Sequence, residues 1–325
     1  MKALISGYYG FGNFGDELIL SCLCSHLKSL GIDVTVLSSN PKITSVDNGV
    51  DALYSFDFKS LPEIIFKHDI LISGGGSLLQ DVTSKKSLIY YLGVIFLAQL
   101  LRKKVLIFAQ GIGPINNKFL RFLSKILLKN CKYVSVRDNK SLDLLNSWGI
   151  NADLVCDPVF SLYLPQYTPQ NIVGVQLRDF ANLDKNNLSK FAKMLAERYS
   201  DKKIQLFSFQ DSFDFEISKY FVKLLKNYNE NIDVEILHAL TYHEIIHKMA
   251  NVDTLFAMRF HALIIALMYG IKTVAINYDV KVEKLANEAE IPLVDLEFEN
   301  INDVEPKHVV MSKIFNWSGF DTNLK

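Results

Sequence analysis

The sequence predicts an α/β protein with two Rossmann-like, parallel-sheet domains facing a cleft, on three observations. Short apolar segments alternate with longer helical patterns along the chain, which is typical of βαβ units. The short segments are apolar at nearly every position, as expected for strands covered on both faces. A segment rich in proline and polar residues, 157–171, divides the elements into two sets. We therefore place one domain at 1–165 and a second at 166–325, with the last helix as a candidate for packing back onto the first.

Each domain contains five apolar segments that we predict to be strands. In the first domain they are 2–7, 33–39, 69–76, 104–111 and 133–138. In the second domain they are 172–179, 202–210, 234–237, 254–260 and 272–279. Because ligands of parallel sheets bind beyond the carboxyl ends of the strands, we expect the active site in the cleft, at these ends.

Composition indicates a folded protein and excludes little else. The 325 residues are 49% hydrophobic, and 35 Lys and Arg balance 35 Asp and Glu, so charge gives no support for a nucleic-acid partner. The start of the chain, 1–10, resembles a first strand rather than a secretory signal. The apolar segment 88–101 is shorter than the about 20 residues of a membrane span, so we predict a buried core helix there.

Four cysteines lack the spacing of a metal site and are expected to be core thiols of a cytoplasmic protein. They are Cys22, Cys24, Cys131 and Cys156. The segment "HEIIH", 243–247, matches the zinc-protease pattern but is followed by no third ligand, so we interpret it as a surface helix.

A glycine-rich turn follows the first strand, in "GYYGFGNFGDE" at 7–17. Its G-x-G-x-x-G spacing resembles a dinucleotide fingerprint, but the second strand ends in 38–40, "SSN", without a carboxylate for a ribose hydroxyl. We predict instead that backbone N–H groups and Asn13 face a polar ligand, with a purely structural turn as the alternative. Asp16 and Glu17 lie in the first turn of the next helix, where carboxylates are electrostatically favoured, which explains both without any function.

Further polar residues follow other predicted strands of the first domain. We expect glycines there to let the backbone approach an oxygen-rich ligand closely. The candidate binding residues are Gly75, Gly76, Ser77, Asp81, Gln110 and Arg137. An ion pair between Arg137 and Asp138 is the structural alternative for that arginine.

The second domain carries cationic groups at the corresponding strand ends. In "FAMRFHALIIALMYG", 256–270, Arg259 ends a strand and His261 opens an apolar helix. A guanidinium, an imidazole and a helix N-terminus together indicate an anion site beside a titratable group. The alternative is a capping histidine next to a structural arginine. Arg178 and Lys281 follow neighbouring predicted strands.

One segment combines basic and apolar residues at helical spacing. In 118–132, Lys118, Arg121, Lys125 and Lys129 recur every three or four residues among Phe and Leu. Basic amphipathic helices can lie on anionic lipid, so peripheral membrane contact competes here with an ordinary solvated face.

These motifs, in order along nearly the whole chain, resemble the polysaccharide pyruvyl transferases, specifically the CsaB-like branch. The residues that carry the resemblance are "GNFGDELIL", "SGGGSLLQDVTSKKSLIYYLGVI", "QGIGP", "RD", "DPVF", "MRFHALIIA" and "YDVKVEKL". Two positions depart from the family pattern: Val280 stands where proline is usual, and Phe260 where leucine is usual. Neither change removes a functional group.

The resemblance implies a GT-B-like fold and a transfer of pyruvate from phosphoenolpyruvate to a sugar as a ketal, without a cofactor or metal. It implies a lipid-linked N-acetylmannosamine acceptor, cell-wall polysaccharide and S-layer anchoring, and a site at the inner face of the membrane. With it, we assign Arg259 and Lys281 to the donor anions and His261 as general acid. Asp16 or Asp81 is the candidate base, and Arg137 assists at donor or acceptor. A GT-B glycosyltransferase using a nucleotide sugar, or a non-catalytic sugar-binding protein, remains the alternative.

Overall fold

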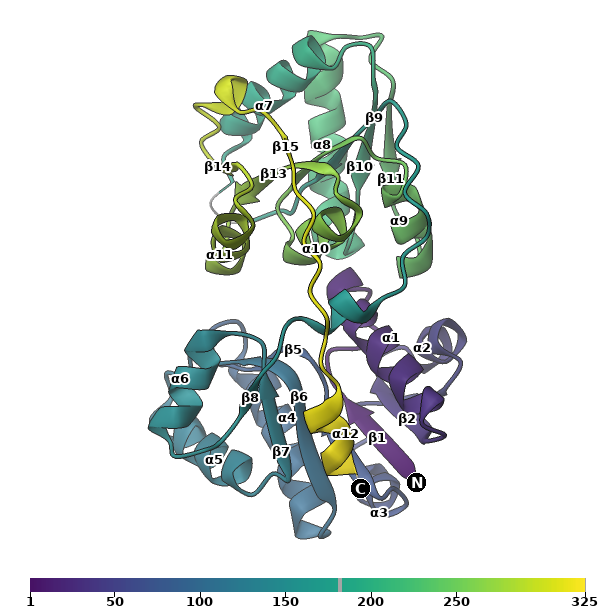
Figure 1. Ribbon diagram of the computed structural model, residues 1–325, viewed down its shortest axis with the longest axis vertical. Helices are drawn as coiled ribbons and strands as arrows, with labels where there is room; N and C mark the ends of the chain where they lie inside the picture. The colour runs from purple at the N-terminus through teal and green to yellow at the C-terminus, as the bar shows by residue number, and fades with distance from the viewer. Residues whose placement is uncertain (181–182, 325) are drawn as a thin grey trace. The chain divides into compact units, whose positions relative to one another are not determined.

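The computed structural model describes residues 1–180 and 183–324, which form two compact units. The first unit contains Met1–Leu162 and the C-terminal residues 313–324, and the second contains Tyr163–Ser312. In each unit, helices pack on a sheet of parallel strands (Figure 1). The predicted α/β fold is confirmed.

The sheet of the first unit has the strand order β3-β2-β1-β4-β6-β7-β8, with β5 paired to β6. Its neighbours are parallel, as the crossover helices require. The strands are β1 (Lys2–Ser6), β2 (Asp33–Ser38), β3 (Asp51–Tyr54), β4 (Ile70–Ser73), β5 (Gly76–Leu79), β6 (Lys104–Ile112), β7 (Tyr133–Val136) and β8 (Asp153–Leu154).

Helices of the first unit begin where a polar side chain accepts a hydrogen bond from the first turn. Asn13, Asn40, Ser84, Asn117 and Asp138 cap five of them in this way. The helices are α1 (Phe14–Ser29), α2 (Pro41–Asn48), α3 (Leu61–Phe66), α4 (Lys85–Leu100), α5 (Lys118–Lys129), α6 (Asn139–Ser147), the 3₁₀ turn η1 (Pro158–Ser161) and α12 (Ser318–Leu324).

The C-terminal segment packs on the first sheet. Phe320 lies 5.0 Å from the ring of Phe108, which is fully buried in β6. Trp317 stacks on His26 at 3.7 Å, and His26 Nε2 lies 2.7 Å from Asp321 Oδ1. An aromatic cluster and one side-chain hydrogen bond therefore attach the C-terminal segment to this unit.

The sheet of the second unit has the order β11-β10-β9-β12-β13-β14, all parallel, with the short β15 antiparallel to β13. The strands are β9 (Ile172–Gln176), β10 (Lys203–Phe207), β11 (Val234–Leu237), β12 (Thr254–Ala257), β13 (Lys272–Asn277), β14 (Leu293–Asp295) and β15 (Lys307–His308). The helices are α7 (Lys185–Arg198), α8 (Asp211–Tyr228), α9 (Tyr242–Met249), α10 (Phe260–Tyr269), α11 (Val280–Ala289) and the 3₁₀ turn η2 (Ile301–Asp303).

The ten predicted strands are all present, whereas β3, β5, β8, β14 and β15 were not predicted. Strands β8, β14 and β15 have only two or three residues, too few to show a pattern, and β3 is largely exposed and lacks a continuous apolar run. Strand β5 begins in the glycine run that ends the predicted strand 69–76.

The predicted core helix at 88–101 is only half correct. Helix α4 does bury Leu88, Leu92 and Ile95, but its outer side leaves Ile89 and Phe96 about half exposed. A helix that is apolar all round is expected to be buried, and here one apolar side remains on the surface.

Two further features concern the whole described chain. Within residues 1–180 and 183–324, no helix has the length and apolarity to cross a membrane. The four cysteines are present as free thiols, and burial raises the pKa of Cys22, Cys24 and Cys131 to about 12.

Candidate active site

The glycine-rich turn after β1 is held by its own contacts. Gly10 and Gly12 have φ of 79° and 67°, the left-handed region that favours glycine. The Tyr9 carbonyl accepts the Ser39 N–H at 2.9 Å, which holds the turn close to the end of β2. A Cβ at Gly10 would therefore collide with Ser38 Oγ. Asn13 caps α1 by accepting the Gly15 N–H at 3.2 Å. The turn thus packs against the end of β2 and leads directly into α1.

Glu17 is a functional candidate that sequence reasoning passed over as a helix-terminus carboxylate. Its Oε1 accepts the Gly10 N–H at 2.8 Å, from the turn before its own helix. Burial, with a smaller contribution from neighbouring Asp16, raises the pKa of Glu17 to about 8. A carboxyl group with this pKa can donate or accept a proton near neutral pH.

The three glycines after β4 allow close packing against α1. A Cβ at Gly75 would lie 2.5 Å from Ile19 Cγ2, and one at Gly76 would lie 2.6 Å from Asp16 Oδ1. Asp16 is half-buried, and its carboxylate lies against the backbone of Gly76. The structure therefore brings Asp16 and Gly76 together, from segments sixty residues apart.

Gln110 and Asp81 bind the protein backbone rather than pointing outward. Gln110, fully buried in β6, donates to the carbonyls of Ser73 and Gly74 at 3.1 and 2.8 Å. The two carboxylate oxygens of Asp81 accept the N–H groups of Asn116 and Asn117, each at 2.7 Å. These hydrogen bonds lower the pKa of Asp81. Gln110 thus fixes the start of the glycine segment after β4, and Asp81 fixes the segment before α5. The sequence did not predict these two roles.

Arg137 pairs with Asp157 and not with its neighbour Asp138. Arg137 Nη1 lies 2.6 Å from Asp157 Oδ2, with both side chains buried. Its Nη2 lies 3.4 Å from Ser77 Oγ, so the arginine connects β5 to the segment after β8. Asp138 instead caps α6 by accepting the Ser141 N–H at 2.9 Å. The suggested Arg137–Asp138 ion pair is therefore wrong.

In the second unit, Arg259 is fixed by the buried carboxylate of Asp214, a residue that no sequence motif indicated. Its Nη2 and Nε lie 2.6 and 3.0 Å from the two oxygens of Asp214, which is fully buried in α8. The Arg259 N–H donates to Gln176 Oε1 at 2.7 Å. The side chain of Arg259 is 8% exposed. In the described part of the chain, its Nη1 has no hydrogen-bond partner.

Asp214 itself is held on several sides. The N–H groups of Phe209 and Gln210 donate to its Oδ2 at 2.9 and 3.0 Å. Burial raises the pKa of Asp214, against the lowering effect of Arg259. A carboxylate fixed in this way presets the rotamer of the arginine and limits the entropy that ligand binding would remove.

His261 lies in the first turn of α10, two residues after Arg259. Its ring is half-buried and meets the Phe260 ring edge to face at 5.3 Å. Arg259 occupies the N-cap position of α10 and makes no capping hydrogen bond with its side chain. A helix N-terminus, a guanidinium and an imidazole therefore lie together at the end of β12.

Two other predicted residues follow the strands on either side of β12. Arg178 follows β9, and its guanidinium lies 4.8 Å from the Phe213 ring. Lys281 is exposed in the first turn of α11, after β13. Tyr278 was not among the predicted residues. Burial raises its pKa, while the charges of Arg259 and Arg178 both lower it, so all three residues lie near one another. The carboxyl ends of β9, β12 and β13 thus bring the cationic residues to one edge.

The "HEIIH" segment forms the exposed helix α9, as predicted. Glu244 completes a capping box by accepting the Thr241 N–H at 2.8 Å, which explains the glutamate without a metal. Within the described residues, no group of three His, Cys, Asp or Glu side chains could hold a metal ion.

Residues 13–280 match the family model of polysaccharide pyruvyl transferase. The chain matches no curated protein.

Solved structures show the same fold at low identity. The UDP-GlcNAc 2-epimerase from Methanocaldococcus jannaschii has a TM-score of 0.68 at 13% identity, over 97% of this chain and 95% of that one. The enzyme of the same name from Neisseria meningitidis, bound to UDP-GlcNAc, has 0.63 at 12%, over 93% and 90%. MurG from Acinetobacter baumannii has 0.54 at 13%, over 93% and 89%. These similarities establish a GT-B-like fold alone.

Proposed function

Because the chain belongs to the polysaccharide pyruvyl transferase family, we propose that it transfers pyruvate from phosphoenolpyruvate to a sugar as a ketal. The observation that carries this proposal is the group of Arg259, Asp214 and His261 at the end of β12. Phosphoenolpyruvate has a phosphate and a carboxylate, so its site needs several positive groups. A fixed arginine beside a helix N-terminus supplies them, and Lys281 and Arg178 add charge from the neighbouring strands.

We assign proton transfer to the donor to His261. The imidazolium gives a proton to the methylene carbon, so that positive charge develops at the carbon bearing the phosphate. A sugar hydroxyl bonds to this carbon, the bond to the phosphate oxygen breaks, and a neighbouring hydroxyl closes the ketal. The two hydroxyl protons balance the one gained by carbon and the one carried by the released hydrogen phosphate. Imidazole suits this step because its pKa lies near neutral pH.

We assign the acceptor to the first unit. Asp16 and Glu17 are the preferred bases for the hydroxyl, because the oxygens of Asp81 already bind backbone N–H groups. Gly75 and Ser77 would then contact the acceptor and Arg137 the acceptor or the donor phosphate, while Gln110 holds the first of the glycines that follow β4.

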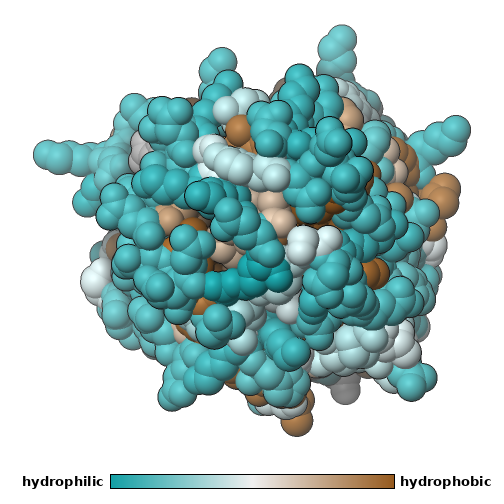
Figure 2. Space-filling model, turned by 90° about the horizontal axis from the view of Figure 1, so that it is seen from above, coloured by the Kyte–Doolittle hydropathy of each residue, from teal (hydrophilic) through white to brown (hydrophobic). Residues whose placement is uncertain are grey.

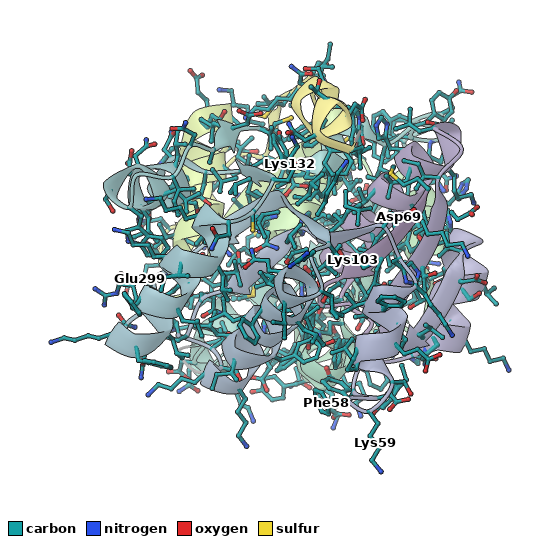
Figure 3. The ribbon with its side chains drawn as sticks, turned by 90° about the horizontal axis from the view of Figure 1, so that it is seen from below. Phe58, Lys59, Asp69, Lys103, Lys132 and Glu299 are labelled. Atoms are coloured by element: carbon teal, nitrogen blue, oxygen red, sulfur yellow. The ribbon has the colours of Figure 1, made fainter. Side chains whose placement is uncertain are left out.

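Exposed aromatic rings at the same edge of the first sheet support a glycan acceptor. Phe11 stacks on Tyr8 at 4.2 Å, and Phe56 lies 5.6 Å from Tyr90. Phe58, which is labelled in Figure 3, is 62% exposed and extends the cluster at 6.3 Å from the Phe56 ring. Exposed aromatic patches of this kind often mark binding sites, and ring faces pack well on the apolar faces of sugars.

We infer that the acceptor is an N-acetylmannosamine unit of a lipid-linked cell-wall precursor, as in the CsaB-like branch and its role in S-layer anchoring. The reaction would then take place at the cytoplasmic face of the cell membrane. The basic amphipathic pattern of α5 supports this assignment.

The test is incubation of the protein with phosphoenolpyruvate and an N-acetylmannosamine-containing glycolipid, followed by mass spectrometry and phosphate detection. In D₂O, the ketal methyl should carry one deuterium, since its third hydrogen comes from solvent through the acid. His261→Ala should lower turnover by about 10²- to 10⁴-fold with an unchanged circular dichroism spectrum. Full turnover of His261→Ala would remove the assigned acid. Transfer from UDP- or GDP-sugars without phosphoenolpyruvate would instead establish a glycosyltransferase.

A further inference from the structure

The outer side of α4 is apolar where a surface helix is normally polar. Its inner side packs in the core, yet Ile89, Phe96 and Leu100 are 55%, 52% and 64% exposed. With Gly93 they recur at helical spacing and form one stripe. Core packing therefore accounts for one side of this helix only.

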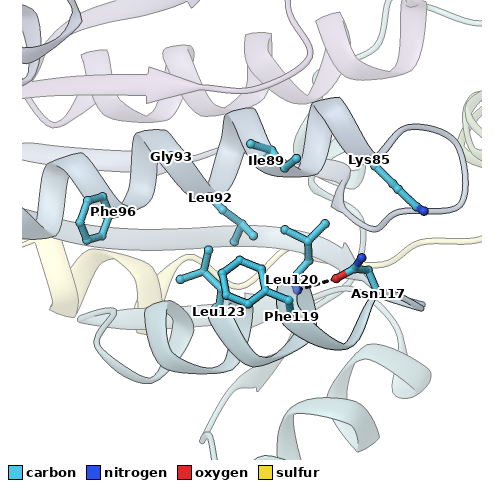
Figure 4. Close-up of a pocket in the computed structure, with 9 residues that line it drawn as sticks. All are labelled: Lys85, Ile89, Leu92, Gly93, Phe96, Asn117, Phe119, Leu120 and Leu123. Carbon is cyan, nitrogen blue, oxygen red and sulfur yellow. Dashed lines mark hydrogen bonds between the residues drawn. The ribbon is translucent and has the colours of Figure 1, made fainter.

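Helix α5 extends this stripe into a continuous surface. Phe119, Phe122 and Ile126 are 70%, 61% and 42% exposed, again at a spacing of three to four residues. The two helices pack together, and a groove of about 450 Å³ runs between them (Figure 4). Leu92 and Phe119 line the groove, and Lys85 lies at one end of it. We call the exposed sides of α4 and α5 the α4/α5 face.

The charge of this region is strongly one-sided in a chain whose net charge is zero. Residues 82–132 contain ten Lys and Arg and no Asp or Glu. The basic residues are Lys85, Lys86, Arg102, Lys103, Lys104, Lys118, Arg121, Lys125, Lys129 and Lys132. Four lie along α5, and two begin α4. Lys103 and Lys132 lie at the opposite edge of the sheet, before β6 and β7, on the face seen in Figure 3.

The face of the second unit shown in Figure 2 differs from this surface. It is mostly hydrophilic, with hydrophobic residues in small separate spots. Such scattered residues are normal on soluble proteins, whereas a continuous apolar face bordered by one sign of charge indicates a binding surface.

We propose that the α4/α5 face docks on an anionic lipid bilayer. Phe119, Phe122 and Phe96 enter the boundary between headgroups and acyl chains, and the surrounding lysines contact lipid phosphates. Charge complementarity favours this occupant. A second copy of the chain docked through the same face would oppose two strongly basic surfaces, which is unfavourable.

The position of the face also fits the proposed acceptor. Helices α4 and α5 begin at the carboxyl edge of the first sheet, and Asp81 ties the segment before α5 to the loop that follows β5. A bilayer held here lies beside the residues assigned to the sugar. The link between the bilayer and the sugar rests on the proposed function and its lipid-linked acceptor. The docking of the α4/α5 face on a bilayer does not depend on that acceptor.

The test is co-sedimentation of the full chain with two kinds of vesicle. One contains phosphatidylcholine alone, and the other also contains about 30% of the anionic lipid phosphatidylglycerol. Wild type should bind the anionic vesicles, and about 0.5 M salt should release it. The double variants Phe119→Ser/Phe122→Ser and Lys118→Glu/Lys125→Glu should each bind at least tenfold more weakly. Tyr163→Ser, at a site 97% exposed in the second unit, is the matched control and should bind as wild type does.

A fluorescence signal that appears on binding complements these losses of vesicle binding. Phe119→Trp should show a blue-shifted emission on anionic vesicles and quenching by brominated acyl chains. Turnover with a water-soluble short acceptor should be unchanged in both double variants, which separates failure of docking from failure of the proposed chemistry. Wild type that ignores anionic vesicles, double variants that bind them normally, or a dimer abolished by Phe119→Ser/Phe122→Ser would each overturn the proposal.

Discussion

Arg137 in the first unit and Arg259 in the second each follow a strand, and each contacts a buried aspartate, but the two pairs differ in construction. Asp214 grips Arg259 through two of its nitrogens and is itself fixed by backbone N–H groups. Asp157 Oδ2 lies 2.6 Å from Arg137 Nη1, and its Oδ1 accepts the Val159 N–H at 3.1 Å. The first arrangement presets one guanidinium for a planar anion, and the second links separate segments of its unit.

This difference gives the two units distinct tasks in the proposed reaction. The second unit places fixed positive charge and a titratable ring at one strand end. The first unit offers carboxyl groups, glycine turns and exposed aromatic rings. A donor with two negative groups fits the former, and a polyhydroxyl acceptor fits the latter.

The largest effect is expected from removing the two aspartates. Asp214→Ala leaves a buried, uncompensated guanidinium and should destabilise the second unit by about 3–5 kcal/mol. Asp157→Ala also leaves a buried guanidinium, but Arg137 keeps Ser77 Oγ at 3.4 Å, so the first unit should lose less, about 1.5–3 kcal/mol.

Urea unfolding followed by two probes measures both effects. The two tryptophans, Trp148 and Trp317, lie in the first unit, so their fluorescence reports that unit, while circular dichroism reports both. Asp214→Ala should therefore move the circular dichroism transition more than the fluorescence transition. Equal costs for the two variants would show that the pairs are equivalent.

A smaller effect is expected from replacing each arginine by lysine, which keeps the charge but loses the planar fork. Arg259→Lys should lower kcat/KM for phosphoenolpyruvate by about ten- to hundredfold, as expected for one or two weakened ionic hydrogen bonds. Arg137→Lys should change kcat/KM for the donor less than KM for the acceptor. Steady-state kinetics with each substrate varied in turn separates the two, and a reversed pattern would exchange the roles assigned to the units.

A further effect concerns the pH dependence of stability in the first unit. The pKa of Glu17 is raised to about 8, so its protonated form stabilises the folded state. This contribution is complete below the unfolded pKa of about 4.3 and is lost as the pH rises through about 8. Relative to Glu17→Gln, the wild type should lose thermal stability between pH 5 and 9, a window taken from those two values. If the melting temperatures of the two proteins changed equally with pH across this range, the pKa of Glu17 would not be raised in the folded state.

The fold was predictable because covered parallel strands are apolar runs that need no knowledge of tertiary contacts. Strands of two or three residues and the largely exposed β3 lack such a signal, and the prediction for α4 was half wrong because its exposed side is as apolar as its buried side. At the site, the chemistry-bearing residues Arg259 and His261 could be selected because only one residue separates them in the sequence. Their partner Asp214 could not, since it lies 45 residues away within an ordinary helical pattern.

Local sequence also misassigned partners where tertiary structure decides them. Asp138 is next to Arg137, but a helix N-terminus uses it as a cap, and Asp157 takes the arginine. Glu17 looked like a helix-terminus carboxylate, and only the burial seen in the structure identifies it as a candidate acid or base.

Titration calorimetry with phosphoenolpyruvate, without acceptor, tests the central assignment of the donor to the second unit most directly. Lys281→Ala and Arg259→Lys should each raise the Kd at least about tenfold, equivalent to about 1.4 kcal/mol. Ser77→Ala, in the first unit, should leave it within about twofold, less than 0.5 kcal/mol. Normal binding by both second-unit variants, with binding lost in Ser77→Ala, would contradict the account.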